Sequence, residues 1–289
     1  MEMVAAAKIR RATDRVFNAL PWANCISDML ISTAKYAPLD SEPLLITHDE
    51  VKRAVVVVVT SDRGLAGGFN SNVLREAEKL IKAKEKQGIE VEVIACGKKA
   101  IGYFNYRGVK PIFEFRDLSA DPTYEEAAEI SAYIGEGYNH GYENGQIDEV
   151  TLVFNHAKNG AEQTLIVQQV LPINMMSFAE VLGLEPKEED VLEPYRDGEK
   201  KIPGDVDFEP DAATVMHQLM VAYLRNTFYY ALIDSAAAEQ GARRTAMKSA
   251  TDNATEMAET LTRLYNRVRQ GAITTEISEI VGGAAALED

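Results

Sequence analysis

The sequence predicts an α/β protein in which two long terminal helices pair as an antiparallel coiled coil and carry a Rossmann-like domain between them. Two long helical stretches at the ends of the chain and alternating strand and helix patterns in the middle predict this fold. The sheet is expected to be mostly parallel, with an antiparallel hairpin at one edge. We expect the coiled coil at residues 1–38 and 210–289, the head at 50–173 and an acidic connection at 174–209.

The C-terminal stretch has no proline after Pro210, and only Gly241 and Gly271 interrupt it before the Gly282-Gly283 pair. At about 1.5 Å per residue, such a helix is a rod on the order of 110 Å, which no small domain can bury. Small or apolar residues follow steps of three and four along its centre, at Met247, Ala250, Ala254, Met257, Leu261, Leu264 and Val268. This spacing is typical of a coiled-coil seam, so the helix requires a partner.

The N-terminal stretch, Met1 to about Ala37, carries a seam of the same period. Its members are Ile9, Ala12, Val16, Ala19, Ala23, Ile26, Leu30, Thr33 and Ala37. Pro21 should bend this helix without ending it, because the seam continues on both sides. Pro38 should end it, since the residue before a proline avoids the helical region. If both helices leave the head at one level, the first covers the second only to about residue 250.

Strand and helix patterns alternate in the middle of the chain. Five consecutive valines within Ala54–Thr60 fit a strand that is buried on both faces. The patterns then predict a helix from an N-cap at Asn70 to Gln87, a strand at Val91–Cys96, a helix at Lys98–Tyr106, a strand at Pro111–Phe115, a helix at Tyr124–His140 and strands at Glu149–Asn155 and Thr164–Leu171. Asn159-Gly160 predicts a hairpin between the last two strands. One helical turn is expected within the connection, at Phe178–Leu182.

Composition excludes several classes of function. A net charge of -15 and a pI near 4.8 argue against a nucleic-acid-binding protein, because phosphate backbones are bound by clustered Lys and Arg. No apolar run approaches the roughly 18 residues of a membrane span, so any membrane association would be through partners. Cys25 and Cys96 form no C-x-x-C pair, which argues against a disulfide framework or a thiolate zinc site and fits a reducing compartment.

The turn Ser61–Asn70 is the main candidate for chemistry, because it joins a buried strand to a helix start, where such sheets often bind phosphate. It lacks the G-x-G-x-x-G spacing and the Lys-Ser/Thr pair of a Walker loop. We therefore favour a structural turn, and keep a nucleotide-binding enzyme that uses this turn as one alternative and a coiled-coil scaffold as another. Asp62 has no evident companions for a metal or nucleophile site. The four histidines, His48, His140, His156 and His217, are scattered and are expected to be surface or packing residues.

Three stretches together resemble the gamma subunit of the F-type ATP synthase. The opening Met1-Glu2-Met3-Val4-Ala5-Ala6-Ala7-Lys8-Ile9-Arg10-Arg11 is similar to the first-helix motif of that family, and Ser61–Asn70 is similar to its signature turn. The third stretch is Ala246–Ala254 with Tyr265-Asn266, Ile273–Ile277 and Ala284–Leu287, which is similar to the C-terminal helix of the family. The resemblance spans nearly the whole chain.

The resemblance implies a rotor that binds no cofactor and has no catalytic residue. It implies one copy per complex, terminal helices inside a ring of alpha and beta subunits, and a head on the membrane c ring beside epsilon, with delta as a further candidate partner. Contacts with the alpha/beta ring carry over to Met1, Lys8, Arg10, Arg11, Arg243, Arg269, Gln270, Thr274, Glu276, Ile277 and Ile280. Contacts with the c ring or epsilon carry over to Asp207, Phe208 and Glu209. The resemblance favours the cytoplasmic face of a bacterial plasma membrane over the mitochondrial matrix or chloroplast stroma.

Two features depart from the family pattern. Family members usually carry further residues before the Met1 motif, and without them the seam from Ala254 to Val268 has no internal partner. We expect either such a segment in the native protein or the ring subunits to cover this part of the seam. The connection at Leu184–Asp205 is longer than usual and lacks the cysteine pair of the chloroplast type, so a thiol switch is not expected.

Overall fold

A computed structural model describes residues 2–34, 36–37, 42–118, 121–142, 145–173 and 207–285. The elements follow in the order α1 (Glu2–Thr33), η2 (Pro43–Leu45), β1 (Arg53–Val59), α2 (Phe69–Lys86), β2 (Glu90–Cys96), α3 (Lys98–Tyr106), β3 (Phe113–Phe115), α4 (Tyr124–Asn139), β4 (Glu149–Ala157), β5 (Gln163–Leu171) and α7 (Ala212–Ala285). Met1, Leu287 and most of the predicted acidic connection, with its helical turn at Phe178–Leu182, lie outside the described residues.

The five strands form one sheet in the order β3-β2-β1-β4-β5. β1 pairs in parallel with β2 and β4, and β3 pairs in parallel with β2. β5 pairs antiparallel with β4, and the Asn159 side chain accepts the backbone N–H groups of Ala161 and Glu162 in the turn between them. The predicted sheet and its edge hairpin are therefore confirmed.

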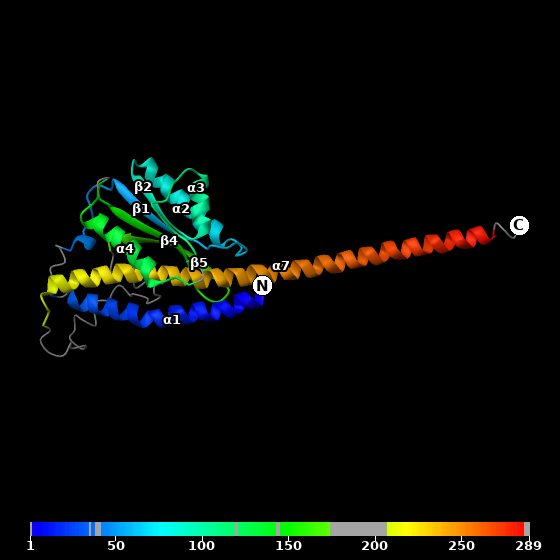
Figure 1. Ribbon diagram of the computed structural model, residues 1–289, viewed down its shortest axis with the longest axis horizontal. Coiled ribbons are helices and arrows are strands. Elements are labelled where there is room, and N and C mark those ends of the chain that lie inside the picture. The colour runs from blue at the N-terminus through cyan, green and yellow to red at the C-terminus, as the bar shows by residue number, and fades with distance from the viewer. Residues whose placement is uncertain are drawn as a thin grey trace, which may run out of the picture.

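The valines of β1 are buried because helices cover both faces of the sheet (Figure 1). Val56 and Val58 belong to one core cluster with residues of α2 and α3. Val55, Val57 and Val59 belong to the other, with residues of α4, α1 and α7. A strand with apolar side chains on both faces suits only this layered arrangement.

α1 lies antiparallel beside the first half of α7 (Figure 1). Every predicted seam residue of the N-terminal stretch is buried or half-buried, and Ala5 extends the seam by one step towards the N-terminus. Ile26 and Leu30 pack in one core cluster with Met216, Met220 and other α7 residues. The helix also continues through Pro21, as predicted. The spacing of small and apolar residues therefore identified the buried face of α1.

Two predicted helix boundaries were wrong. α1 ends at Thr33 and not at Ala37, because the Thr33 carbonyl accepts the N–H groups of both Tyr36 and Ala37 and the chain turns there. Asn70 is not an N-cap: Gly68 occupies that position and Asn70 lies in the first turn of α2. The Asn70 side chain instead accepts the backbone N–H of Ser61 over 2.9 Å, so it closes the turn between β1 and α2.

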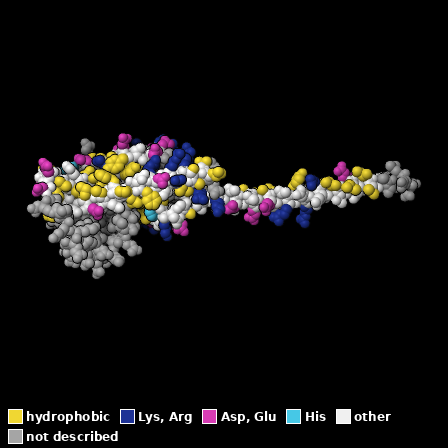
Figure 2. All heavy atoms as spheres, turned by 90° about the horizontal axis from the view of Figure 1, so that it is seen from below, with side chains coloured by type: hydrophobic (Ala, Val, Ile, Leu, Met, Phe, Trp, Pro, Cys, Tyr) yellow, Lys and Arg dark blue, Asp and Glu magenta, His cyan; other side chains and the backbone are white. Residues whose placement is uncertain are grey.

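The second half of α7 protrudes from the rest of the chain as a bare rod (Figures 1 and 2). From Lys248 to Gly283 every residue is exposed except Asn266, which is half-buried. The seam residues Met257, Leu261, Leu264 and Val268 are 54–65% exposed. Coverage by α1 thus ends near the predicted residue 250, and the remaining seam has no partner among the described residues.

Candidate functional site

The turn Ser61–Asn70 packs against the long helix. Phe69 and Ala66 are buried in one cluster with Ala238 and Ala242 of α7. Gly67 has a φ of +57°, and a Cβ built there would lie 3.8 Å from the Ala246 methyl group. The end of β1, where sheets of this class often hold a nucleotide, is therefore covered by α7.

Polar side chains in and next to the turn bond to neighbouring backbone segments of the head. The Asp62 carboxylate accepts the backbone N–H groups of Lys98 and Asp117, each over 3.0 Å. Thr60 Oγ1 accepts the N–H of Ala100 over 2.9 Å. Asp62 thus joins the start of α3 to the loop that follows β3. These bonds support the structural interpretation of the turn over the nucleotide-binding alternative.

Arg243 of α7 fastens this turn to the helix. Its Nη2 atom donates to Glu239 Oε1 one helical turn earlier, at 2.5 Å, and to the Gly64 carbonyl, at 3.3 Å. Both side chains of the ion pair are at least nine-tenths buried. We call the set Gly64, Ala66, Phe69, Glu239, Ala242 and Arg243 the turn–helix clamp. The clamp fixes one rotational position of α7 against the sheet.

β4 and the hairpin hold the adjacent part of α7. His156 Nδ1 lies 2.7 Å from Asp234 Oδ2, and the Ala157 N–H donates to Asp234 Oδ1 over 3.2 Å. The hydrogen bond that His156 makes to the Asp234 carboxylate raises the pKa of His156 above its ordinary value. A Cβ built on Gly241 would lie 3.2 Å from the Gly160 carbonyl oxygen, so the hairpin turn approaches the helix backbone closely. The polar and close-packing contacts between the head and this part of α7 therefore extend from Asp234 to Arg243.

The structure places most predicted ring-contact residues on exposed helix surface. On α1 these are Lys8, Arg10 and Arg11, and on the protruding half of α7 they are Arg269, Gln270, Thr274, Glu276, Ile277 and Ile280. Arg243 differs from them, because its side chain is engaged within the turn–helix clamp. Met1 lies outside the described residues.

Asp207, Phe208 and Glu209 lie at the opposite end of α7 from the protruding half, just before its first turn. Asp207 and Glu209 are exposed, and the half-buried Phe208 ring lies 5.5 Å from the ring of Tyr36. These residues and the second half of α1 line a surface hollow of about 630 Å³ that also includes Met29. Asp207, Phe208 and Glu209 thus lie at the opposite end of α7 from the contact residues Arg269–Ile280.

No three His, Cys, Asp or Glu side chains in the described part of the chain are placed to hold a metal ion. Within the same residues, no helix is long and apolar enough to cross a membrane. Both cysteines are unpaired, with Cys25 exposed on α1 and Cys96 buried in β2.

Sequence reasoning missed the turn–helix clamp and the His156–Asp234 contact. The Glu239–Arg243 spacing of four is a signal for an ion pair on one helix face, although it does not reveal the bond to Gly64. His156 and Asp234 are 78 positions apart, so no local pattern connects them.

The contacts between the head and α7, together with the exposed half of α7 beyond them, define a class of protein: an α/β head that carries one long helix, half of which the described residues leave uncovered. The sequence pattern of the ATP synthase family matches residues 1–287. The ATP synthase gamma chain of Heliobacterium modesticaldum is 40% identical, over 99% of this chain and 92% of its own length. That of Streptomyces coelicolor is 36% identical over 100% and 90%. The chain belongs to the ATP synthase gamma-chain family, and it is a central-stalk rotor subunit of an F-type ATP synthase.

Solved structures support the fold. The central stalk of the Tetrahymena thermophila mitochondrial ATP synthase has a TM-score of 0.60 at 22% identity, covering 87% of this chain and 97% of that one. A chain of the Euglena gracilis mitochondrial ATP synthase has a TM-score of 0.55 at 18% identity, covering 98% and 95%. At these identities the likeness concerns the fold alone.

Proposed function

We propose that the exposed half of α7 turns inside a ring of alpha and beta subunits, while the end near Phe208 rests on a membrane c ring beside epsilon, with delta as a further candidate partner. The observation that carries this proposal is the bare stretch from Lys248 to Gly283, whose apolar seam stays exposed. Exposed apolar surface of this kind marks an interaction site. A seam of coiled-coil spacing without its own partner requires surrounding chains.

The surface of the rod suits a contact that must be made and broken repeatedly. Its large apolar residues, such as Leu261, Ile273 and Ile280, are separated by alanine, threonine and charged residues. A shaft that meets several positions in succession cannot use one large complementary interface, because such an interface would hold it in place. Scattered small contacts lower the barrier between positions.

Charged residues on the two helices supply the second part of the proposed contact. Lys8, Arg10 and Arg11 are exposed on α1 and would face acidic lever segments of the beta subunits. Arg269 and Gln270, with Thr274, Glu276, Ile277 and Ile280, would meet the ring further along α7. The role that we assign to Arg243 is to keep the head and α7 in register under load, through Glu239 and Gly64.

We further propose that the chain is present in one copy per complex, carries no cofactor of its own and reaches the membrane only through its partners, on the cytoplasmic face of a bacterial plasma membrane. Its rotation would deliver the free energy of ions passing through the c ring to the nucleotide sites on beta. The bacterial gamma chains among its relatives support this location.

Arg269→Glu in the assembled complex tests the proposed ring contact. We expect reduced ATP hydrolysis and reduced ATP-driven ion pumping, because the reversed charge meets the wrong sign on the ring. Arg263→Glu is the matched control, since it reverses an exposed charge on the same rod at a position without an assigned contact. Hydrolysis and pumping that are unchanged in Arg269→Glu would refute the contact.

A further inference from the structure

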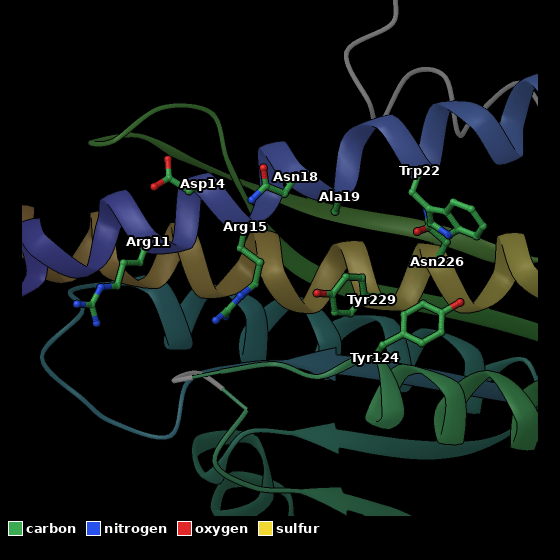
Figure 3. A pocket seen from close by; sticks show the side chains of 9 residues that line it. All are labelled: Arg11, Asp14, Arg15, Asn18, Ala19, Trp22, Tyr124, Asn226 and Tyr229. Carbon is green, nitrogen blue, oxygen red and sulfur yellow. The ribbon is translucent and has the colours of Figure 1, made fainter.

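A groove of about 580 Å³ lies where α1, α4 and α7 meet, and one of its residues, Arg11, also belongs to the proposed ring contacts (Figure 3). The residues that matter for its chemistry are Arg11, Arg15 and Trp22 from α1, Tyr124 from α4, and Asn226 and Tyr229 from α7. Grooves of this size accept small molecules. The rotor role does not account for this combination of arginines, aromatic rings and a buried amide.

Asn226 supplies the main evidence for a ligand. The residue is only 2% exposed, and its side-chain Nδ2 has no hydrogen-bond partner among the described residues. A buried amide donor without an acceptor is costly, whereas an apolar side chain of similar size would cost little at such a position. Because Asn226 lines the groove, an acceptor oxygen or ring nitrogen of a ligand would satisfy it.

Three aromatic residues form the walls. The rings of Tyr124 and Tyr229 meet edge to face, with centroids 5.4 Å apart, and the Arg225 guanidinium carbon lies 5.7 Å from the Tyr124 ring centre. These contacts hold both tyrosines in place. Trp22 is 57% exposed and leaves part of its indole surface open. Such walls suit a flat ring, which gains stacking contacts without ordering flexible side chains.

Two guanidinium groups, those of Arg11 and Arg15, supply the candidate anion contacts of the groove. In Figure 3, Arg11 and Arg15 extend to the same side of α1, and the Asp14 carboxylate points to the other. Arg15 pairs with Asp121, an exposed carboxylate on the loop before α4. A guanidinium has five N–H donors, so this pair leaves Arg15 with donors for a second anion.

We infer that this groove binds a small planar anion: an aromatic ring that carries a phosphate or carboxylate group. The ring lies between Trp22 and the two tyrosines, an acceptor on the ligand receives the Asn226 amide, and the anionic group meets Arg11 and Arg15. The inference rests on the groove and shares only Arg11 with the proposed ring contacts.

Phenyl phosphate is a suitable probe, with inorganic phosphate and phenol as probes that carry only the charge or only the ring. Trp22 is the single tryptophan of the chain, so its fluorescence reports directly on the groove of the full-length protein. We expect saturable quenching by phenyl phosphate, and binding at least about tenfold weaker for either partial probe, because each lacks one set of contacts.

Asn226→Asp keeps the side-chain volume but replaces the donor by a carboxylate, and Arg11→Gln removes one cation. Each should weaken phenyl phosphate binding by about tenfold, while Arg10→Gln, which changes a neighbouring arginine that does not line the groove, should leave it unchanged. Circular dichroism shows whether Asn226→Asp folds. If it does not, the site is tested by Arg11→Gln and by a calorimetric titration of Trp22→Leu with phenyl phosphate, and both variants should bind the probe more weakly.

Three results would overturn the inference. Inorganic phosphate that binds as well as phenyl phosphate would show an ordinary ion contact without a ring site. Binding that Arg11→Gln and Asn226→Asp leave intact would place the ligand elsewhere. No saturable binding of phenyl phosphate would mean that the Asn226 amide is not a ligand-binding group.

Discussion

His156 Nδ1 of β4 lies 2.7 Å from Asp234 Oδ2 of α7, so a side chain of the sheet and a side chain of the long helix share one hydrogen bond. Asp234 is only 1% exposed and also accepts the Ala157 N–H. This contact and the turn–helix clamp beside it join the head to α7, in addition to the α7 residues packed in the main core cluster. The α/β head thus anchors the long helix α7.

The stability that the His156–Asp234 contact contributes should depend on pH. The Asp234 carboxylate raises the pKa of His156 above the ordinary 6.5. A group with a raised pKa in the folded state contributes stability that is fully present below its unfolded pKa and is lost as the pH rises through the folded value. His156→Gln keeps a hydrogen-bond donor but removes the charge. We expect it to lower the free energy of unfolding by about 1–2 kcal/mol at acidic pH and by less at alkaline pH.

Urea denaturation near pH 5.5 and near pH 8.5 checks this, since these values lie on opposite sides of the ordinary histidine pKa of about 6.5. His140→Gln, which changes an exposed histidine after α4, is the control and should show no such trend. A loss in His156→Gln that is equal at both pH values would mean that the contact does not depend on the charge of the imidazole.

The Glu239–Arg243 pair should behave as a buried ion pair. Arg243→Leu leaves the Glu239 carboxylate buried without its cation, and we expect a loss of about 3 kcal/mol in the free energy of unfolding. The double variant Glu239→Leu with Arg243→Leu should recover most of that loss, because no charge then remains buried. Denaturant unfolding of the two single variants and the double variant measures the coupling. Additive losses would show that the two side chains act independently.

Two glycines of α7 provide a matched test of how closely the hairpin approaches the helix. Gly241→Leu places a side chain against the Gly160 carbonyl, whose oxygen would lie 3.2 Å from the new Cβ, and should cost about 2 kcal/mol. Gly271→Leu meets nothing within 4 Å and should raise helix stability slightly, by up to about 1 kcal/mol. Thermal unfolding distinguishes the two. Equal effects would refute the close packing at Gly241.

Patterns with a short period allowed much of this fold to be predicted. The three-and-four spacing from Ile9 to Thr33 identified the buried face of α1, because a helix repeats its faces within a few residues. The valine run of β1 indicated a strand covered on both faces, and Asn159-Gly160 indicated the hairpin. Each of these signals is contained in neighbouring residues.

Contacts between distant segments could not be predicted in the same way. Three histidines that were expected to be surface or packing residues each lie next to a carboxylate far away in sequence, in the pairs His48–Asp148, His156–Asp234 and His217–Glu42. Asn70 was assigned as an N-cap from its residue type, but its side chain binds Ser61 instead. These contacts depend on how the folded segments pack together, which no local spacing records. The same holds for the groove at Asn226.

Cross-linking from the middle of the bare rod tests the central claim most directly. Leu264→Cys, in a background with the exposed Cys25 changed to Ser, places a reactive thiol on the exposed seam, and the native Cys96 stays buried. With a photoactivatable thiol reagent in the assembled complex, we expect this site to cross-link to alpha or beta subunits and to stop ATP hydrolysis. Lys86→Cys on the head should do neither. A Leu264 site that reaches no ring subunit, or a cross-linked complex that still turns over at full rate, would contradict the account.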